Sequence, residues 1–311
     1  MQTIHSDQKP HPSATVSNMS VLHEHLELGQ FIPFVYHYNM LADAARMDAF
    51  QEAVALAVQP GARVVDLGGG TGVLSFFAAQ RAAKVWCVER NPELVQAARH
   101  ILAMNPGGER VKVVHADAFD YLPPEPVDVV ICEMLHVGML REKQIPVIDS
   151  FKQRYLEKFG EPLPRFVPEA FIQAVQPVQQ SFDFNGYCAP TPFFQNPVTE
   201  QSRTIDIGNP VIYQFCSYHE SLPMECCWES ALAIERDGQL NALRFITKNV
   251  LAIAEAERRT VDWFSQYLVV PLDEPLAVKA GQHITVSFAY RPGDPISALK
   301  PTATPVRHVP L

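Results

Sequence analysis

A glycine-rich loop directly after a buried strand constrains the fold of this chain more than any other feature. Residues 64–67 read Val-Val-Asp-Leu, and residues 68–72 continue as Gly-Gly-Gly-Thr-Gly. Glycines let a backbone approach a ligand where a Cβ atom would clash. Such a loop between a strand and a helix is typical of open α/β sheets, which bind ligands at the carboxyl ends of parallel strands. The loop therefore predicts a Rossmann-like domain with a ligand site above it.

From residue 63 onward, segments of strand and helix character alternate at the spacing of βαβ units, which predicts a parallel sheet with right-handed crossovers. A helical period over residues 40–58 ends at Pro60-Gly61, just before the first strand. The expected strands are 63–67, 84–89, 111–115 and 127–132, and the expected helices are 74–81, 92–104 and 142–159.

After Pro168 the chain changes to short β-branched and aromatic runs separated by turns. This pattern predicts an antiparallel β-domain, built as a barrel or a sandwich. Residues 182–203 read as a long excursion from that sheet, and residues 293–311 as a Pro-rich, loosely ordered tail. The expected strands are 171–175, 211–216, 226–234, 243–250, 260–269 and 283–290.

These changes in pattern predict the domain boundaries. The fold class is α/β, with N-terminal helices before the Rossmann-like domain and an antiparallel β-barrel-like domain after it. The expected order is a flexible tail over 1–20, a helical cover over 21–60, the Rossmann-like domain over 61–167, the β-rich domain over 168–292 and the Pro-rich tail over 293–311.

Composition narrows the class of protein and its partners. Apolar residues make up 47% of the 311 residues and charged residues 19%, as in globular proteins. No apolar run nears the roughly 20 residues of a membrane span, and the polar start does not resemble an export signal. The six cysteines form no CxxC pair, and the formal charge of −9 disfavours non-specific nucleic-acid binding. We therefore expect a cytoplasmic protein without a metal, membrane or nucleic-acid partner.

Acidic residues accompany three successive predicted strands at the ligand edge. Asp66 lies in the first strand, Glu89 ends the second and Asp117 follows the third. Glu89 is placed to accept hydrogen bonds from ribose hydroxyls, and Asp117 suits an adenine edge. The glycine spacing is G-x-G-x-G instead of the G-x-G-x-x-G of dinucleotide sites, so these features disfavour a nicotinamide or flavin cofactor.

This arrangement resembles the class I S-adenosylmethionine-dependent methyltransferases. In that family the glycine loop holds the methionine part of the donor, one strand-end acid binds its ribose, and the next acid lies near its adenine. The resemblance therefore implies S-adenosyl-L-methionine as the cofactor. The residues that it assigns to the donor site are Asp66, Gly68, Gly70, Glu89 and Asp117.

The residues after the fourth strand narrow the resemblance. Glu133 and Glu142 stand nine positions apart, as do the two glutamates in the loop of the protein arginine methyltransferases. Residues 40–46, Met-Leu-Ala-Asp-Ala-Ala-Arg, resemble the helix that closes over the donor in that family. The resemblance implies that Met40 contacts the donor's sulfur region and that Arg46 pairs with its carboxylate.

The likeness to this family spans residues 34–292. Residues 166–168, Phe-Val-Pro, resemble the family's join to its β-barrel, and residues 261–263, Val-Asp-Trp, lie where the family has Thr-His-Trp. Asp262 therefore replaces the family's His, and a proton relay through that imidazole is changed or absent. His37 and His136 are candidate proton acceptors nearby.

Paired carboxylates suit a guanidinium acceptor for a chemical reason. A guanidinium has a pKa above 12, and its nitrogen lone pairs are delocalised. Two carboxylates can hold it bidentately, draw charge away from the attacking nitrogen and align that nitrogen with the donor methyl. Glu133 and Glu142 are therefore the predicted catalytic residues.

The leading prediction is an S-adenosylmethionine-dependent methyltransferase that N-methylates an arginine guanidino group in a protein. Two alternatives stay open: methylation of a small molecule such as free arginine, and a methyltransferase-like binding protein without catalysis. The altered loop around Glu133 and the replacement at Asp262 motivate them. Residues 182–194 take the position of the family's dimerisation arm, so a homodimer also stays open.

Overall fold

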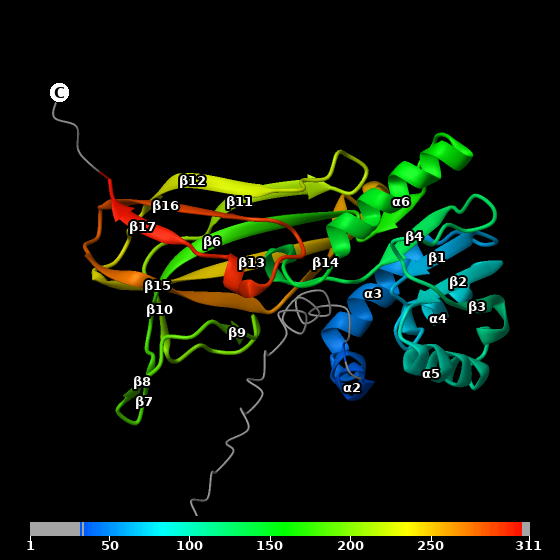
Figure 1. The fold of residues 1–311 in the computed structure, drawn as a ribbon, viewed down its shortest axis with the longest axis horizontal. Helices are drawn as coiled ribbons and strands as arrows, with labels where there is room; N and C mark the ends of the chain where they lie inside the picture. The colour runs from blue at the N-terminus through cyan, green and yellow to red at the C-terminus, as the bar shows by residue number, and fades with distance from the viewer. Residues whose placement is uncertain (1–31, 33, 307–311) are drawn as a thin grey trace, which may run out of the picture.

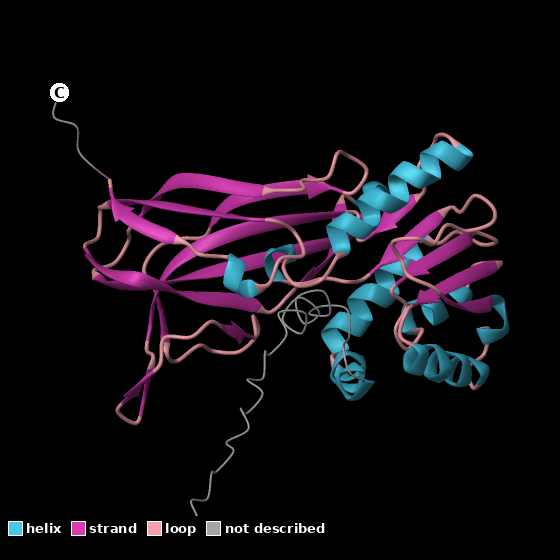
Figure 2. Ribbon diagram, in the orientation of Figure 1, coloured by secondary structure: helices cyan, strands magenta, loops and turns pink. Residues whose placement is uncertain are grey.

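The computed structural model describes residue 32 and residues 34–306, which form two parts along the long axis of the molecule (Figure 1). One part holds a parallel sheet with helices, and the other is built almost entirely of strands (Figure 2). The tail expected over residues 1–20 lies outside the described residues, as does most of the segment from 21 to 33.

Five parallel strands form the first sheet, in the order β3-β2-β1-β4-β5. β1 (Arg63–Leu67) lies at the centre, between β2 (Lys84–Glu89) and β4 (Val129–Cys132). The edge strands are β3 (Val111–His115) and β5 (Arg165–Val167). The βαβ prediction is confirmed, and the glycine loop, Glu89 and Glu133 all lie where strands end, at the same edge of the sheet.

Three helices connect these strands and cover an apolar core. Val65 and Leu67 of β1 are fully buried, and burial of such a side chain stabilises the fold by about 1.5–3 kcal/mol. The connecting elements are α4 (Val73–Ala79), α5 (Pro92–Ala103), the short 3₁₀ turn η1 (Gly108–Arg110) and α6 (Gln144–Phe159).

The helical period over residues 40–58 is divided between two helices, so the prediction of one continuous helix is wrong. α2 (Phe34–Ala42) ends just before Asp43, and α3 (Ala44–Ala57) begins just after it. Asp43 is the N-cap of α3, where its carboxylate accepts a hydrogen bond from the Arg46 backbone N–H at 3.0 Å. An N-cap aspartate satisfies an N–H group that the helix leaves unpaired, and it therefore marks a new helix start.

The second part contains a seven-stranded and a three-stranded antiparallel sheet. β13 pairs with β6, β14 and β15 in the larger sheet, whereas β16 lies between β12 and β17 in the smaller one. The strand bounds are β6 (Ala170–Gln180), β11 (Val211–Ser217), β12 (Cys226–Ala233), β13 (Gly238–Ala254), β14 (Arg259–Phe264), β15 (Tyr267–Val278), β16 (His283–Tyr290) and β17 (Thr302–Pro305).

The two sheets pack around a shared aromatic core. The rings of Phe245 and Phe288, one from each sheet, lie 5.1 Å apart in an edge-to-face arrangement. Tyr213 also contacts Phe288, at 5.1 Å. The antiparallel prediction is confirmed, and in the described residues the two ladders pack as separate sheets.

Two details of this domain differ from the sequence predictions. The single strand expected over 260–269 is two strands, because the chain leaves the β13 ladder after Phe264 and returns at Tyr267; the 3₁₀ turn η3 (Glu255–Glu257) precedes them. The tail expected from residue 293 is ordered through η4 (Ile296–Ala298) and β17, because β16 offers a free edge for pairing.

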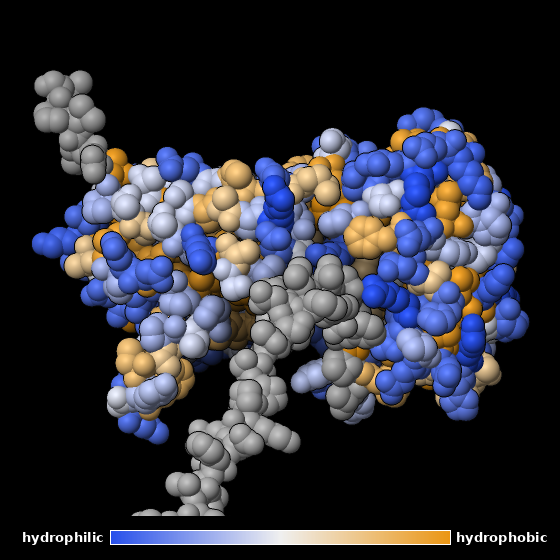
Figure 3. All heavy atoms as spheres, viewed as in Figure 1, coloured by the Kyte–Doolittle hydropathy of each residue, from blue (hydrophilic) through white to orange (hydrophobic). Residues whose placement is uncertain are grey.

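The excursion over residues 182–203 is a projecting hairpin with a polar base. β7 (Asp183–Phe184) pairs with β8 (Tyr187–Cys188), while β9 (Phe193–Gln195) and β10 (Thr204–Asp206) rejoin the large sheet. Figure 3 shows hydrophobic residues on this hairpin.

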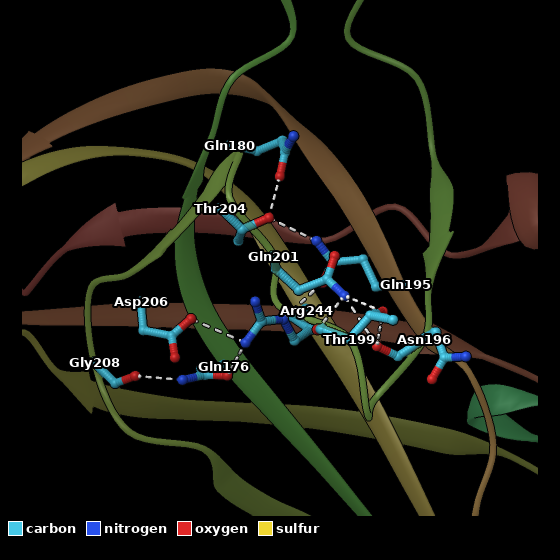
Figure 4. A network of polar contacts seen from close by, with 10 residues as sticks. All are labelled: Gln176, Gln180, Gln195, Asn196, Thr199, Gln201, Thr204, Asp206, Gly208 and Arg244. Carbon is cyan, nitrogen blue, oxygen red and sulfur yellow. Dashed lines mark hydrogen bonds and ion pairs between the residues drawn. The ribbon is translucent and has the colours of Figure 1, made fainter.

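Arg244 of β13 anchors the two returning strands (Figure 4). Its guanidinium donates hydrogen bonds to Gln195 at 3.0 Å and to Gln176 and Asp206 at 2.9 Å each. Arg244 is only 7% exposed, and its bonds to Gln195 and Gln176 are shielded from solvent, so they fix the hairpin to the sheet.

Candidate active site

The glycine loop, residues 68–72, adopts a backbone that other residues would strain. Gly68 and Gly70 have φ values of +78° and +54°, which favour glycine. A Cβ atom on Gly70 would lie 2.9 Å from the His37 ring, and one on Gly68 would lie 3.1 Å from the Met134 side chain. The loop is therefore approached by α2 from one side and by the segment after β4 from another.

Glu89 is held at the end of β2 by two backbone groups. Its carboxylate accepts hydrogen bonds from the Gly70 N–H at 2.9 Å and from the Asn91 N–H at 2.7 Å. Each carboxylate oxygen has a further lone pair, so the side chain keeps capacity to accept bonds from a pair of ribose hydroxyls. This geometry fits the adenosyl part of S-adenosylmethionine.

Asp117 lies after β3, in a tight turn at the same edge. It accepts a hydrogen bond from the Phe119 N–H at 3.0 Å and pairs with Arg90 at 3.2 Å. The structure therefore places Glu89 and Asp117 at the ends of neighbouring strands, and their assignment to the ribose and the adenine of the donor stays a prediction.

Asp66 lies beneath the glycine loop and is 1% exposed. It accepts a hydrogen bond from the Ser75 hydroxyl at 2.7 Å, and burial raises its pKa to about 7. A Cβ atom on Gly69 would lie 3.3 Å from the Asp66 carboxylate. In this structure the side chain of Asp66 supports the loop from below, and its assignment to the donor site stays a prediction.

Arg46 joins the N-terminal helices to the residues after β4. Its guanidinium donates to the Met40 carbonyl at 3.3 Å, forms an ion pair with Glu133 and lies 5.3 Å from the centre of the Phe50 ring. The Arg46 side chain is 6% exposed and that of Glu133 is 14% exposed. Arg46 is expected on the donor carboxylate; its partner in this structure is Glu133, and the assignment to the donor stays a prediction.

Residues 133–142, here called the double-glutamate loop, bring two carboxylates into one environment. Desolvation, and after it the nearby Glu133, raise the pKa of Glu142 to about 8, against the opposing effect of Arg141 and Arg46. A buried carboxylate beside a like charge favours its neutral form. The site is thus poised to accept a cation, which would let both carboxylates ionise.

The backbone of this loop is fixed by the β-domain. The Gly138 N–H, in the 3₁₀ turn η2 (Val137–Met139), donates to the Thr247 hydroxyl of β13 at 2.9 Å. Arg141 has a φ of +61°, and the Glu142 N–H donates to the Leu140 carbonyl at 2.6 Å, which closes a strained three-residue turn.

A turn over residues 291–294, here called the C-terminal turn, also holds the loop. The Gly293 N–H donates to the Met139 carbonyl at 2.7 Å, and the Arg141 N–H donates to the Asp294 carbonyl at 2.7 Å. Lys143 donates to the Gly293 carbonyl at 3.1 Å. These bonds reach both sides of the strained turn that precedes Glu142.

The two candidate proton acceptors occupy different places. His37 contacts the glycine loop, and burial lowers its pKa. His136 packs edge-on against Phe194 at 5.4 Å, and burial lowers its pKa to about 4. In the described residues, Nε2 of each ring is buried without a hydrogen-bond partner. Both imidazoles are therefore neutral near pH 7.

Asp262 pairs with a cation of its own sheet. Its carboxylate lies 2.7 Å from Lys248 Nζ, and it accepts a hydrogen bond from the Thr260 hydroxyl at 3.0 Å. The residue that replaces the family's histidine is therefore engaged in an ion pair within the β-domain.

Sequence reasoning missed Gln144 and the C-terminal turn. Gln144 carries no recognisable motif, although it is fully buried beside the double-glutamate loop. The dipeptide Pro292-Gly293 does mark a turn, but nothing in the sequence says what that turn contacts.

Within the described part of the chain, no cluster of three or more His, Cys, Asp or Glu side chains is arranged to hold a metal ion. Among the helices of residues 34–306, none combines the length and apolar character that crossing a bilayer requires.

Comparisons with known proteins identify the first domain. Residues 64–154 match the model of a methyltransferase domain. An uncharacterised protein of Methanocaldococcus jannaschii is 26% identical over 85% of this chain and 95% of its own length. An arginine N(omega)-methyltransferase of Streptomyces achromogenes is 29% identical over 82% of this chain and 76% of its own length.

Further matches concern the protein arginine methyltransferases. A probable protein arginine N-methyltransferase 6 of Arabidopsis thaliana is 30% identical over 52% of this chain and 37% of its own length. A solved Trypanosoma brucei PRMT1 enzyme–prozyme complex with AdoHcy contains a chain of the same fold. That chain gives a TM-score of 0.67 at 19% identity, with 82% of this chain and 87% of that chain covered.

Proposed function

We propose that this chain, a class I S-adenosylmethionine-dependent methyltransferase that resembles the protein arginine methyltransferases, N-methylates the guanidino group of arginine in a protein. The observation that carries the proposal is the pairing of Glu133 and Glu142 beside Arg46, at the edge where the glycine loop opens. Two carboxylates in one partly buried site need a cation, and a guanidinium matches them in charge and in shape.

The proposed chemistry assigns separate tasks to the donor and to the protein. When bound, S-adenosylmethionine would supply a methyl group from its sulfonium, and the rest of the donor would leave as a neutral thioether. Glu133 and Glu142 hold the guanidinium and orient one nitrogen toward that methyl, so the step gains from proximity. The attacking nitrogen loses a proton as the N–C bond forms. Glu142, whose pKa is raised to about 8 in the free site, is basic enough to accept that proton.

The environment of Asp262 supports a proton path through the glutamates. An imidazole relay requires a histidine where this chain has Asp262, and that carboxylate is paired with Lys248 at 2.7 Å. His136 has a pKa lowered to about 4 and is a poor base at neutral pH.

We further propose a cytoplasmic homodimer that uses the β7–β8 hairpin. Phe184 and Tyr187 at its tip are 49% and 72% exposed, and Tyr36 and Tyr38 on α2 are 57% and 73% exposed. Exposed aromatic side chains of this kind are typical of protein interfaces. Light scattering on the wild type and on Phe184→Ser/Tyr187→Ser tests this point, since a monomeric wild type contradicts it.

The activity test follows a labelled methyl group from the donor to arginine-containing peptides and to free arginine. The wild type is expected to label peptides, and Glu142→Gln is expected to lose that label. Glu274→Gln is the matched control, because Glu274 is exposed on β15. Label in free arginine alone would establish the small-molecule alternative. Bound donor without label in either acceptor would favour a non-catalytic protein.

A further inference from the structure

The side chain of Gln144 hydrogen-bonds to the backbone at the start of the double-glutamate loop. Its Nε2 donates to the Cys132 carbonyl at 2.7 Å, and its Oε1 accepts from the Met134 N–H at 2.9 Å. Gln144 is 0% exposed, so neither bond competes with water. One amide group thereby hydrogen-bonds to the backbone on both sides of Glu133.

These two hydrogen bonds lie just beyond the last residue pair of the parallel sheet. The register of β4 with β1 ends at Cys132, and its register with β5 ends one residue earlier, at Ile131. In a parallel ladder, the N–H of one residue donates to the carbonyl of the residue that precedes its opposite partner, and its own carbonyl accepts from the N–H of the residue that follows that partner. The Gln144 amide makes that same pair of bonds around Glu133, so it fixes the Glu133 backbone beyond the last strand pair.

Gln144 is also tied to the other carboxylate through the chain. It is the first residue of α6 and stands two positions after Glu142. The Glu142 backbone is fixed on its other side by the strained turn at Arg141 and by the Asp294 carbonyl. The Gln144 side-chain amide therefore sets the distance between the Glu133 backbone and the Glu142 backbone.

We propose that Gln144 is a positioning residue that sets the separation of Glu133 and Glu142; this inference rests on the proposed function of that pair. The Gln144 amide supplies both the donor and the acceptor that this site uses. An apolar side chain of the same length leaves the Met134 N–H and the Cys132 carbonyl unpaired.

The test compares Gln144→Met and Gln144→Leu with a matched control, Gln153→Met, at an exposed residue farther along α6. We expect kcat for an arginine peptide to fall roughly ten- to one-hundred-fold in both Gln144 variants, since a small misplacement at a reacting centre has effects of this size. The Kd for S-adenosylhomocysteine is expected to stay within about twofold, because the donor site does not include Gln144. Thermal unfolding identifies the variants that fold.

A second readout separates positioning from simple loss of stability. NMR of ¹³C-labelled glutamate carboxyls follows the ionisation of Glu142 without any acceptor. If the loop widens, Glu133 repels Glu142 less, and the Glu142 titration moves to lower pH in Gln144→Met. This readout also serves if the wild type methylates no arginine, an outcome that would refute the proposed function alone. An unchanged titration in a folded Gln144→Met protein, or unchanged kcat in an active one, would overturn the role of Gln144.

Discussion

The raised pKa of Glu142 predicts a steep pH dependence of methyl transfer. Its value of about 8 lies well above the ordinary 4.5, because the carboxyl is desolvated and faces Glu133. Only the ionised form completes the pair that holds a guanidinium. At pH 7 about one tenth of Glu142 is ionised in the free enzyme, and at pH 6 about one hundredth. We therefore expect kcat/KM to rise about tenfold per unit up to pH 8 and then to level off.

The measurement is the initial rate of label transfer to an arginine peptide between pH 6 and pH 9.5. The acceptor itself does not titrate in this range, since its guanidinium pKa exceeds 12. The variant Glu142→Gln is expected to give a low and flat profile. A wild-type kcat/KM that is constant from pH 6 to pH 9 would refute the reasoning, because it would mean that Glu142 is already ionised or is not required.

Three substitutions around the donor site make further predictions. Asp66 has a pKa of about 7 in the folded protein and an ordinary pKa of 3.8, so the folded state is expected to lose stability as pH rises from about 4 to 7. Asp66→Asn should remove that loss and raise the free energy of unfolding at pH 8 by up to about 4 kcal/mol. Chemical denaturation measures this change. Gly70→Ala places a Cβ atom 2.9 Å from His37 at a φ of +54°, and it should weaken S-adenosylhomocysteine binding, measured by calorimetry, at least tenfold. The control Gly281→Ala also has a positive φ but open space around it, and it should leave that binding unchanged. Arg46→Lys lacks the fork that reaches both Met40 and Glu133, and kcat should fall about tenfold while the protein still folds.

The donor side could be predicted from the sequence because its residues follow one another along the chain. The glycine loop directly follows β1 and Glu89 ends β2, so the parallel order of the strands places them together. Local rules also predicted the antiparallel character of the second domain, but not the break between β14 and β15. They were not enough for α2 and α3, where the cap at Asp43 outweighed a continuous apolar period.

The acceptor side could be predicted only as far as its two glutamates. Their surroundings depend on contacts between residues that are far apart in sequence, such as Gly138 with Thr247 and Lys143 with Gly293. A pattern along the chain does not encode which distant backbone group meets a given loop. For the same reason the sequence predicts a loose tail from residue 293, although Gly293 and Asp294 hydrogen-bond to the double-glutamate loop.

The contact between the C-terminal turn and the double-glutamate loop has a consequence for how a new molecule matures. Lys143 and Gly293 are 150 residues apart in the chain. At a synthesis rate of about 5–20 residues per second, roughly 8–30 seconds separate the appearance of these two residues. Such a distant contact also forms late in folding, because its loop must first close. The glycine loop and its parallel sheet can thus form well before the C-terminal turn holds the double-glutamate loop. A nascent chain therefore acquires its acceptor site last.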